Sequence, residues 1–285
     1  MTNISSCRFC KSSNINVLKS IQSPHFNHKY LLYHCSECNS KFHNPNEIDI
    51  SYDKMYQDIA NETTDLLNEE YKPNRTWIRQ KSVIQKLLKK SPESILDVGC
   101  RTGSFLMHFD KKIDRVGVEL SHQFADVGKK RGLNIYTDFI ENIKFDKQFN
   151  VVSSYAVLEH LTDPIPVIQD LKKLVKKDGL LIILVPWHEC LKEKILYKLN
   201  IQWHMFCPPS HLNFYSKKFL NKIVKAEGNF ELVYSFSTSG GIFNPFRRIP
   251  ILNKAFGLFM HYYDMSFMNK IAIFDHLYVY YRKIK

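Results

Sequence analysis

From residue 94 onward, short runs of apolar residues alternate with stretches in which apolar residues recur three and four positions apart. Runs rich in Val, Ile, Leu and Phe predict strands, and the three-and-four spacing predicts helices. The expected strands are 94–98, 115–119, 133–136, 149–155, 180–185, 230–237 and 277–283, and the expected helices are 102–110, 121–131, 163–176 and 216–227. Strands that alternate with helices are typical of α/β proteins. We therefore expect a seven-stranded, mostly parallel sheet with helices on both faces.

The residues before this alternation have a helical pattern without strands. Apolar residues keep helical spacing over 77–88, and this helix should lie beside the ligand crevice of the sheet. The spacing of Tyr52 and Tyr56 predicts a shorter helix that docks onto the main domain. We expect residues 49–93 to be a helical linker that packs on a main domain spanning 94–285.

The N-terminal 48 residues contain two cysteine pairs. Each pair has the spacing C-x2-C, and the pairs are separated by 24 residues: Cys7, Cys10, Cys35 and Cys38. Four thiolates at this spacing predict a closed, tetrahedral structural zinc site. The alternative, a redox pair, normally needs a βαβ unit for which this segment is too short. We expect residues 1–48 to form a zinc ribbon with strands at 30–34 and 41–43, almost no apolar core, and folding energy that comes largely from the metal.

The segment 94–106 contains a ligand-binding turn. An apolar strand that includes Asp97 is followed by a tight turn with Gly99 and Gly103, and ligands bind at this edge of a parallel sheet. These glycines are four residues apart and follow an acid, whereas a dinucleotide fingerprint spaces its first and third glycines by five. The acid suits a ligand with a positive end. Glu119, at the tip of the next strand, suits a pair of ribose hydroxyls.

These features resemble the class I S-adenosylmethionine-dependent methyltransferases, which have a Rossmann-like fold. The resemblance covers residues 1–285, and it rests on the ordered segments 95–103, 117–119, 149–161, 177–183 and 211–216. With its leading zinc ribbon, the chain is similar to methyltransferases of bacterial clusters that build surface polysaccharides and modify sugars.

The resemblance implies how the cofactor S-adenosylmethionine binds. It assigns the methionine end to Asp97, Gly99, Cys100, Arg101 and Gly103, the ribose to Glu119, and the adenine to Asp138 and Phe139. Arg101 departs from the family, which usually has glycine there. Either Arg101 adopts the glycine-like backbone with its side chain turned outward, or cofactor binding is weakened.

The expected reaction is methylation of a hydroxyl of a sugar or sugar-derived intermediate, with a small-molecule, nucleotide-linked or lipid-linked acceptor. A hydroxyl must lose its proton, and histidine is the usual general base. The candidate bases are His211, whose ring should be free at the crevice mouth, His160 and His204, with Tyr155, another residue or no base as alternatives. Trp187, Trp203 and Tyr215 either form a wall for a sugar ring or pack in the core.

Two other functions remain open. A C-methyltransferase acting on a keto-sugar would use a base to form a carbanion. A non-catalytic binding module would have its pocket closed by Arg101, with the zinc ribbon recruiting a partner.

Charge and apolar runs bear on partners and location. The net charge of +12 comes from scattered Lys and Arg, which favours a solvated basic surface or a phosphate-bearing or anionic-membrane partner, and nucleic acid is not expected. The longest apolar run, 180–185, is far shorter than the roughly 20 residues of a membrane helix. The N-terminus lacks a secretory pattern, so a cytoplasmic location is expected. Residues 240–275 predict a helical insertion: a lid, a homodimer interface, or a basic amphipathic surface that contacts the inner face of the membrane.

Overall fold

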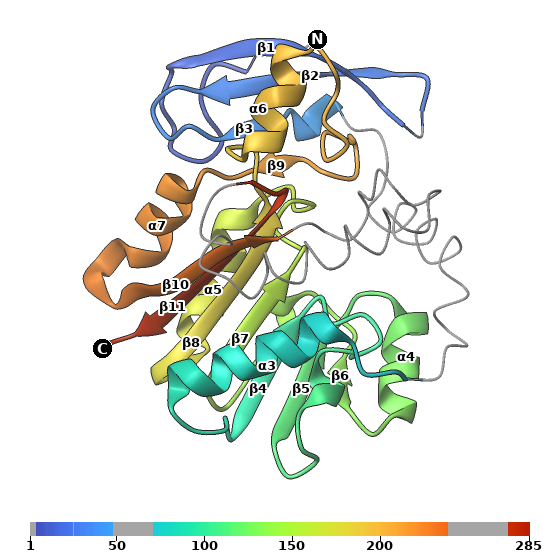
Figure 1. Ribbon diagram of the computed structural model, residues 1–285, viewed down its shortest axis with the longest axis vertical. Coiled ribbons are helices and arrows are strands. Elements are labelled where there is room, and N and C mark those ends of the chain that lie inside the picture. Colours follow the sequence, from blue (N-terminus) through green and yellow to red (C-terminus); the bar gives the residue numbers. More distant parts are fainter. Residues whose placement is uncertain (1–3, 25, 48–70, 239–272) are drawn as a thin grey trace, which may run out of the picture.

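The computed structural model describes residues 4–24, 26–47, 71–238 and 273–285. Within these ranges the chain forms two sheets, a small one built mainly from the N-terminal residues and a large one that carries the rest of the fold (Figure 1). The predicted helix near Tyr52 and Tyr56 and nearly all of the 240–275 insertion lie outside the described residues. No helix in the described ranges combines the length and the apolar character needed to cross a lipid bilayer.

The large sheet has seven strands in the order β10-β11-β8-β7-β4-β5-β6. The strands are β4 (Ser94–Val98), β5 (Asp114–Val118), β6 (Asn134–Tyr136), β7 (Phe149–Tyr155), β8 (Val175–Pro186), β10 (Phe230–Thr238) and β11 (His276–Lys283). Strands β4 to β8 pair in parallel, while β11 is antiparallel to both β8 and β10. The predicted α/β fold with a mostly parallel seven-stranded sheet is confirmed.

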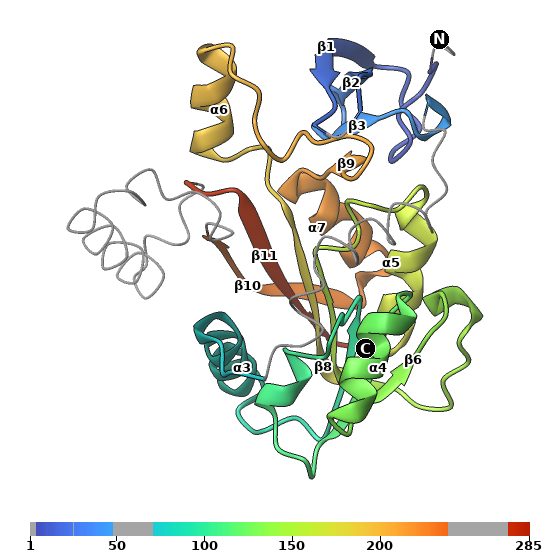
Figure 2. The same cartoon turned by 90° about the vertical axis from the view of Figure 1, so that its right-hand side faces the viewer.

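Alternate residues of the central strand β8 face two separate cores. Leu181 and Ile183 belong to one buried cluster, and Leu180 and Ile182 belong to the other. Helices α5 (Pro164–Lys173) and α7 (Lys217–Lys225) cover the first face, and α3 (Arg75–Leu88) covers the second (Figure 2). Each fully buried aliphatic side chain contributes about 1.5–3 kcal/mol, so both faces of this strand stabilise the sheet.

The remaining helices are short. They are α4 (His122–Lys130), α6 (Leu191–Lys198), and the 3-10 helices η1 (Pro45–Glu47), η2 (Leu106–His108), η3 (Ile140–Asn142) and η4 (Ala226–Gly228). The predicted helix over 102–110 is wrong, because only η2 forms there. Arg101 and Gly103 have left-handed φ angles of 49° and 73°, so the chain is still turning where that helix should begin.

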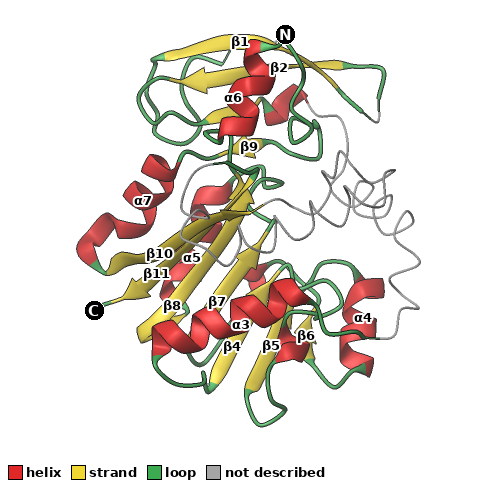
Figure 3. Ribbon diagram, in the orientation of Figure 1, coloured by secondary structure: helices red, strands yellow, loops and turns green. Residues whose placement is uncertain are grey.

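The small sheet contains a strand from the main part of the chain. Its order is β1 (Ile15–Gln22), β2 (Lys29–Cys35), β3 (Lys41–His43) and β9 (Asn213–Phe214), all antiparallel (Figure 3). Strands β2 and β3 were expected, whereas β1 and β9 were not. Because β9 lies about 170 residues after β3 in the chain, local sequence pattern contains no information on this pairing.

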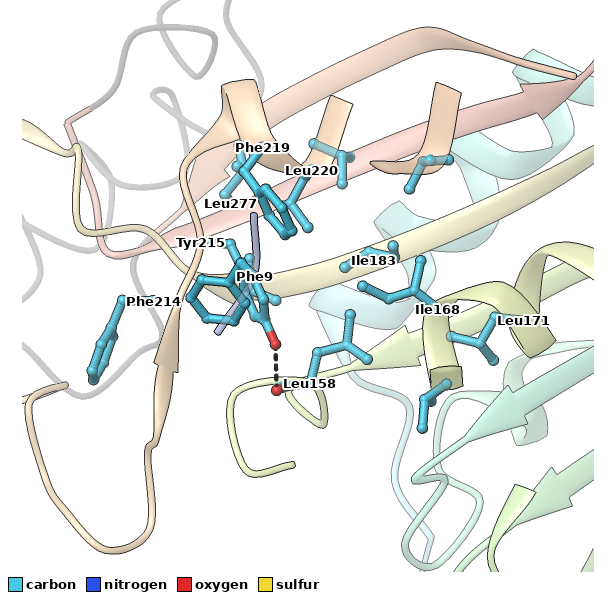
Figure 4. Close-up of a cluster of buried hydrophobic side chains, with 14 of the residues drawn as sticks. Phe9, Leu158, Ile168, Leu171, Ile183, Phe214, Tyr215, Phe219, Leu220 and Leu277 are labelled. Carbon is cyan, nitrogen blue, oxygen red and sulfur yellow. Dashed lines mark hydrogen bonds between the residues drawn. The ribbon is translucent and has the colours of Figure 1, made fainter. Parts of the chain in front are cut away.

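The N-terminal segment also shares its apolar core with the main sheet. Between ring centroids, Phe9 lies 5.3 Å from Tyr215 and 5.3 Å from Phe219 (Figure 4). The Phe42 ring is 5.5 Å from Phe9. All four rings belong to the cluster that continues under α5 and α7. The expectation of almost no apolar core was therefore wrong, since the main domain supplies the residues against which the ribbon packs.

Candidate cofactor site and metal centres

The turn after β4 brings its backbone against two side chains. Gly99 and Gly103 have φ angles of 78° and 73°. A Cβ on Gly99 would lie 2.2 Å from Val157 Cγ2, and one on Gly103 would lie 2.0 Å from Leu133 Cδ1. Both positions therefore need glycine, because of the backbone conformation and because of the space.

Arg101 adopts the conformation usually left to glycine. Its φ is 49°, its side chain is exposed, and its guanidinium lies 5.0 Å from the centroid of the Phe124 ring. A left-handed backbone costs a non-glycine residue about 1–2 kcal/mol. Of the two expectations for this residue, the structure has the first: the backbone turns as glycine would, and the side chain points away from the turn.

The Glu119 carboxylate lies at the end of β5 and is fixed by two backbone amides. Oε2 accepts from the Arg101 amide at 2.9 Å, and Oε1 accepts from the Ser121 amide at 2.9 Å. Each carboxylate oxygen has more than one lone pair, so Glu119 can accept further hydrogen bonds. Burial raises the pKa of Glu119, an effect opposed by these two amides.

Asp97 is buried inside the sheet edge, behind the turn. Its Oδ1 accepts from Ser153 Oγ at 2.7 Å. Burial, together with the nearby Glu119 charge, raises the pKa of Asp97 to about 7. Cys100 is also buried, which raises the pKa of its thiol and makes it an unreactive packing group.

A pocket opens where β4 and β5 end. Its lining includes four of the predicted cofactor-binding residues, namely Gly99, Glu119, Asp138 and Phe139. Asp97, Cys100, Arg101 and Gly103 shape or support the turn but do not line the pocket. Sequence reasoning missed Val98, Val118, Leu120, Ile140, Glu141, Val157, Leu161 and Val167, which complete the lining. Most of these are apolar residues that the sequence places in the core.

Asp138 and Phe139, which the resemblance assigns to the adenine, differ in their contacts. Asp138 Oδ1 accepts from the Phe139 amide at 2.7 Å and from Asn142 Nδ2 at 2.8 Å. Phe139 is 47% exposed and lines the pocket, so it offers an apolar surface there.

The four cysteines of the ribbon come together as the spacing predicts. One sulfur from each of Cys7, Cys10, Cys35 and Cys38 lies within 4.8 Å of the others. The Cys7–Cys38 and Cys10–Cys35 sulfurs are 3.7 and 3.6 Å apart. Zn–S bonds of about 2.3 Å in a tetrahedron separate the sulfurs by about 3.8 Å. The donor set and its spacing therefore fit a structural zinc ion.

The His211 ring is fixed by a hydrogen bond, whereas the sequence predicts a free ring. Its Nδ1 donates to the Met205 carbonyl oxygen at 2.9 Å, and its ring centroid lies 5.0 Å from that of His160. Burial, with the neighbouring His160, lowers the pKa of His211 to about 3. Burial also lowers the pKa of His160. A neutral ring with so low a pKa is a weak general base near pH 7.

His204 belongs to a different group. Its Nε2 is 3.9 Å from Asp275 Oδ2, and burial lowers its pKa. The same aspartate accepts from Trp203 Nε1 at 2.7 Å and from Lys192 Nζ at 2.7 Å. His204 therefore lies beside the buried carboxylate of Asp275, which immediately precedes β11.

The three aromatic residues considered as a sugar wall are buried in the core. Trp203 donates to Asp275, Tyr215 donates from its hydroxyl to the Leu158 carbonyl oxygen at 2.7 Å, and Trp187 donates to Glu189 Oε2 at 3.0 Å. Figure 4 shows the Tyr215 bond. Each ring packs against its neighbours, so the core interpretation holds and the wall was wrong.

A family model described as a methyltransferase domain matches residues 72–235, which include the turn, the Glu119 strand tip and the pocket. The chain belongs to this methyltransferase family. The class expected from the motifs is thus confirmed, whereas the sugar-cluster subgroup stays a prediction.

Curated relatives match part of the chain. An uncharacterised protein of Methanocaldococcus jannaschii is 32% identical over 105 residues, 36% of this chain and 50% of that protein. A ubiquinone biosynthesis O-methyltransferase of Actinobacillus pleuropneumoniae serotype 7 (strain AP76) is 32% identical over 102 residues, 31% of this chain and 44% of that protein. The chain thus spans half or less of the length of these relatives.

Solved structures share the fold over more of the chain. The plantazolicin methyltransferase BpumL with bound S-adenosylhomocysteine has a TM-score of 0.52 at 18% identity, over 85% of this chain and 93% of that one. The N-methyltransferase NodS of Bradyrhizobium japonicum WM9 has a TM-score of 0.50 at 12% identity, over 81% and 98%. At these identities the likeness concerns the fold.

Proposed function

We propose that the protein is an S-adenosylmethionine-dependent methyltransferase that methylates a hydroxyl of a sugar or sugar-derived intermediate. The observation that carries the proposal is the Glu119 carboxylate, which lines the pocket and is held in place by backbone amides. The family membership and the SAH-bound structures with this fold support the same cofactor.

The pocket residues suit the three parts of the cofactor. The turn from Gly99 to Gly103 packs against Val157 and Leu133, and Gly99 lines the pocket, so the turn would lie against the methionine part. Glu119 would accept from both ribose hydroxyls. The exposed Phe139 ring and Asp138 would lie against the adenine.

When bound, S-adenosylmethionine supplies a methyl group on a positively charged sulfur. Transfer of this methyl group to the acceptor hydroxyl would leave S-adenosylhomocysteine, and the hydroxyl proton would pass to solvent. The chain mainly has to hold the acceptor in line with that bond, and such positioning can be worth about 7–11 kcal/mol. Asp97, ionised above pH 7, would add a negative charge beside the positive methionine end.

Two observations bear on the alternatives. A binding module closed by Arg101 is disfavoured, because the Arg101 side chain is exposed and lies over Phe124. Oxygen methylation is favoured over carbon methylation by the similarity to a ubiquinone biosynthesis O-methyltransferase. The sugar acceptor rests on the resemblance of the whole chain, ribbon included, to sugar-modifying methyltransferases.

The test is an acceptor screen with deuterium-labelled substrates. Nucleotide-linked sugars and keto-sugars deuterated next to the carbonyl are incubated with the protein and S-adenosylmethionine, and products are analysed by mass spectrometry. The proposal predicts a methylated product that keeps all its deuterium, with no product from Glu119→Ala. Loss of one deuterium per methyl group would show carbon methylation, and methylation of non-sugar acceptors alone would contradict the sugar assignment.

A further inference from the structure

A second group of metal-ligating side chains lies beside the cofactor pocket. Glu159 and His160 follow β7, and His211 precedes β9; one ligand atom from each lies within 4.8 Å of the others. Val157 and Leu161, which flank Glu159 and His160 in the chain, both line the pocket. This group is separate from the four cysteines of the ribbon.

Backbone carbonyls fix the protonation of both imidazoles. His160 Nδ1 bonds to the Ser210 carbonyl oxygen at 2.6 Å, and His211 Nδ1 bonds to the Met205 carbonyl oxygen at 2.9 Å. Since a carbonyl only accepts, each Nδ1 carries the proton, which leaves the acceptor lone pair of the neutral imidazole on Nε2. Histidine ligands of metals are typically oriented in this way, with the second nitrogen donating to a carbonyl or carboxylate.

The Glu159 carboxyl group is buried. The residue is 1% exposed, and among the described residues Oε2 has no hydrogen-bond partner. The Glu159 carbonyl oxygen accepts from the Leu212 amide at 2.7 Å and the Asn213 amide at 3.1 Å, so the backbone is tied to the segment that carries His211. Burying a carboxylate oxygen without a partner raises the free energy of the folded protein, and a bound cation would remove that penalty.

Strand β3 of the ribbon is linked through β9 to the segments that carry Glu159, His160 and His211. Phe42 of β3 pairs with Asn213 of β9, and Asn213 Nδ2 donates to the carbonyl oxygens of Leu158 and Leu161 at 3.0 and 2.7 Å. The residues on both sides of the three ligands are therefore fixed to one another.

We propose that Glu159, His160 and His211 bind one divalent transition-metal ion beside the cofactor pocket. Two imidazole nitrogens and one carboxylate are a ligand set used for zinc and for ferrous iron, with positions left for other ligands. In a tetrahedron, bonds of about 2.0–2.2 Å place the donor atoms about 3.3–3.6 Å apart, so the three groups, whose ligand atoms now lie within 4.8 Å of one another, would move closer together around the ion. The bound ion could also bind the oxygen of the methyl acceptor. That role rests on the proposed function, whereas binding of the ion itself does not.

Cobalt(II) is the probe. Purified protein with zinc in the cysteine site is titrated with Co²⁺ by calorimetry and by visible absorption. The matched variants are Glu159→Gln, which keeps the side-chain volume and removes the ionisable carboxyl group, His211→Ala, and His122→Ala as a control at an exposed histidine. Thermal unfolding confirms that each variant is folded.

Wild type and His122→Ala should bind one Co²⁺ per chain without a thiolate charge-transfer band. Glu159→Gln and His211→Ala should bind it at least about tenfold more weakly. Absence of this binding in wild type, equal binding in Glu159→Gln, or a thiolate band with release of zinc would each overturn the proposal.

S-adenosylhomocysteine binding, measured on the same samples without cobalt, separates the two proposals. If wild type binds S-adenosylhomocysteine but no Co²⁺, the metal site alone fails. If it binds Co²⁺ but no S-adenosylhomocysteine, the proposed function alone fails.

Discussion

The backbone amide of Arg101 donates a hydrogen bond of 2.9 Å to Oε2 of Glu119. The left-handed backbone of Arg101, with φ of 49°, is part of the turn that presents this amide to the tip of β5. The turn after one strand and the carboxylate after the next are thereby joined. An arginine at a position that usually holds glycine is compatible with a formed pocket.

Arg101→Gly should leave affinity for S-adenosylhomocysteine within about a factor of two, because the same amide still reaches Glu119. The left-handed backbone costs arginine about 1 kcal/mol or more, and the exposed contact with Phe124 returns about 0.5–1 kcal/mol. Chemical denaturation should therefore show a change of less than about 1 kcal/mol. A gain of tenfold or more in affinity would mean that Arg101 obstructs the pocket.

Glu119→Ala should weaken S-adenosylhomocysteine binding by at least about 1.5–3 kcal/mol, the usual value of hydrogen bonds to a charged group. The loss combines the ribose contacts with the bonds that hold the Arg101 and Ser121 amides. Calorimetry measures it, with Glu93→Ala as the control at an exposed glutamate. Unchanged affinity in folded Glu119→Ala protein would place the cofactor elsewhere.

Cofactor affinity should rise with pH up to neutrality. The pKa of Asp97 is raised from its ordinary 3.8 to about 7, so Asp97 is neutral below pH 7 and ionised above it. Only the ionised form attracts the ammonium of the ligand. Affinity for S-adenosylhomocysteine should therefore be about tenfold higher at pH 7.5 than at pH 5.5.

The raised pKa also affects folding. The unliganded fold favours neutral Asp97, so its stability should fall as pH rises from about 4 to 7. Asp97→Asn should reduce both pH dependences, and the exposed control Asp126→Asn should not. Equal affinities at pH 5.5 and 7.5 in wild type would contradict this account of Asp97.

Purified, reduced protein should contain one tightly held zinc in the cysteine site, and Cys35→Ser should lose it. Because Phe9 and Phe42 belong to the core shared with Tyr215 and Phe219, loss of zinc should destabilise more than the ribbon. We expect the free energy of unfolding to drop by at least about 3 kcal/mol.

Cys190→Ser is the matched control. Cys190 caps α6 by accepting from the Glu193 amide at 3.4 Å, and serine is a good residue at that position. It should keep its zinc and lose about 1 kcal/mol or less. Metal analysis and denaturation check both variants, and a Cys35→Ser protein that retains zinc and stability would contradict the site.

The parts of the fold that the sequence predicts are those set by local pattern. Strand β7 was predicted with the bounds it has, 149–155, because Phe, Val and Tyr in so short a run favour a strand. The pairing of Phe42 with Asn213 was not predictable, because it joins segments far apart in the chain. The helix over 102–110 was wrong because turn geometry at Arg101 and Gly103 overrides helical propensity.

Of the candidate site, too, the sequence predicts the parts that are set by local pattern. The strand-tip residues Glu119 and Gly99 were found because the residue types and their spacing mark a turn. The His211 ring is fixed by the Met205 carbonyl oxygen, and buried Trp203 donates to the Asp275 carboxylate. The fold supplies both partners. No pattern of residue types around a single histidine or tryptophan contains that information.

The most direct test of the central claim is calorimetric titration of the wild-type protein, zinc site filled, with S-adenosylhomocysteine at pH 7.5. The pocket of Gly99, Glu119 and Phe139 predicts binding of one molecule per chain. Protein that is folded, contains its zinc and gives no heat of binding would contradict the assignment of this pocket to the cofactor.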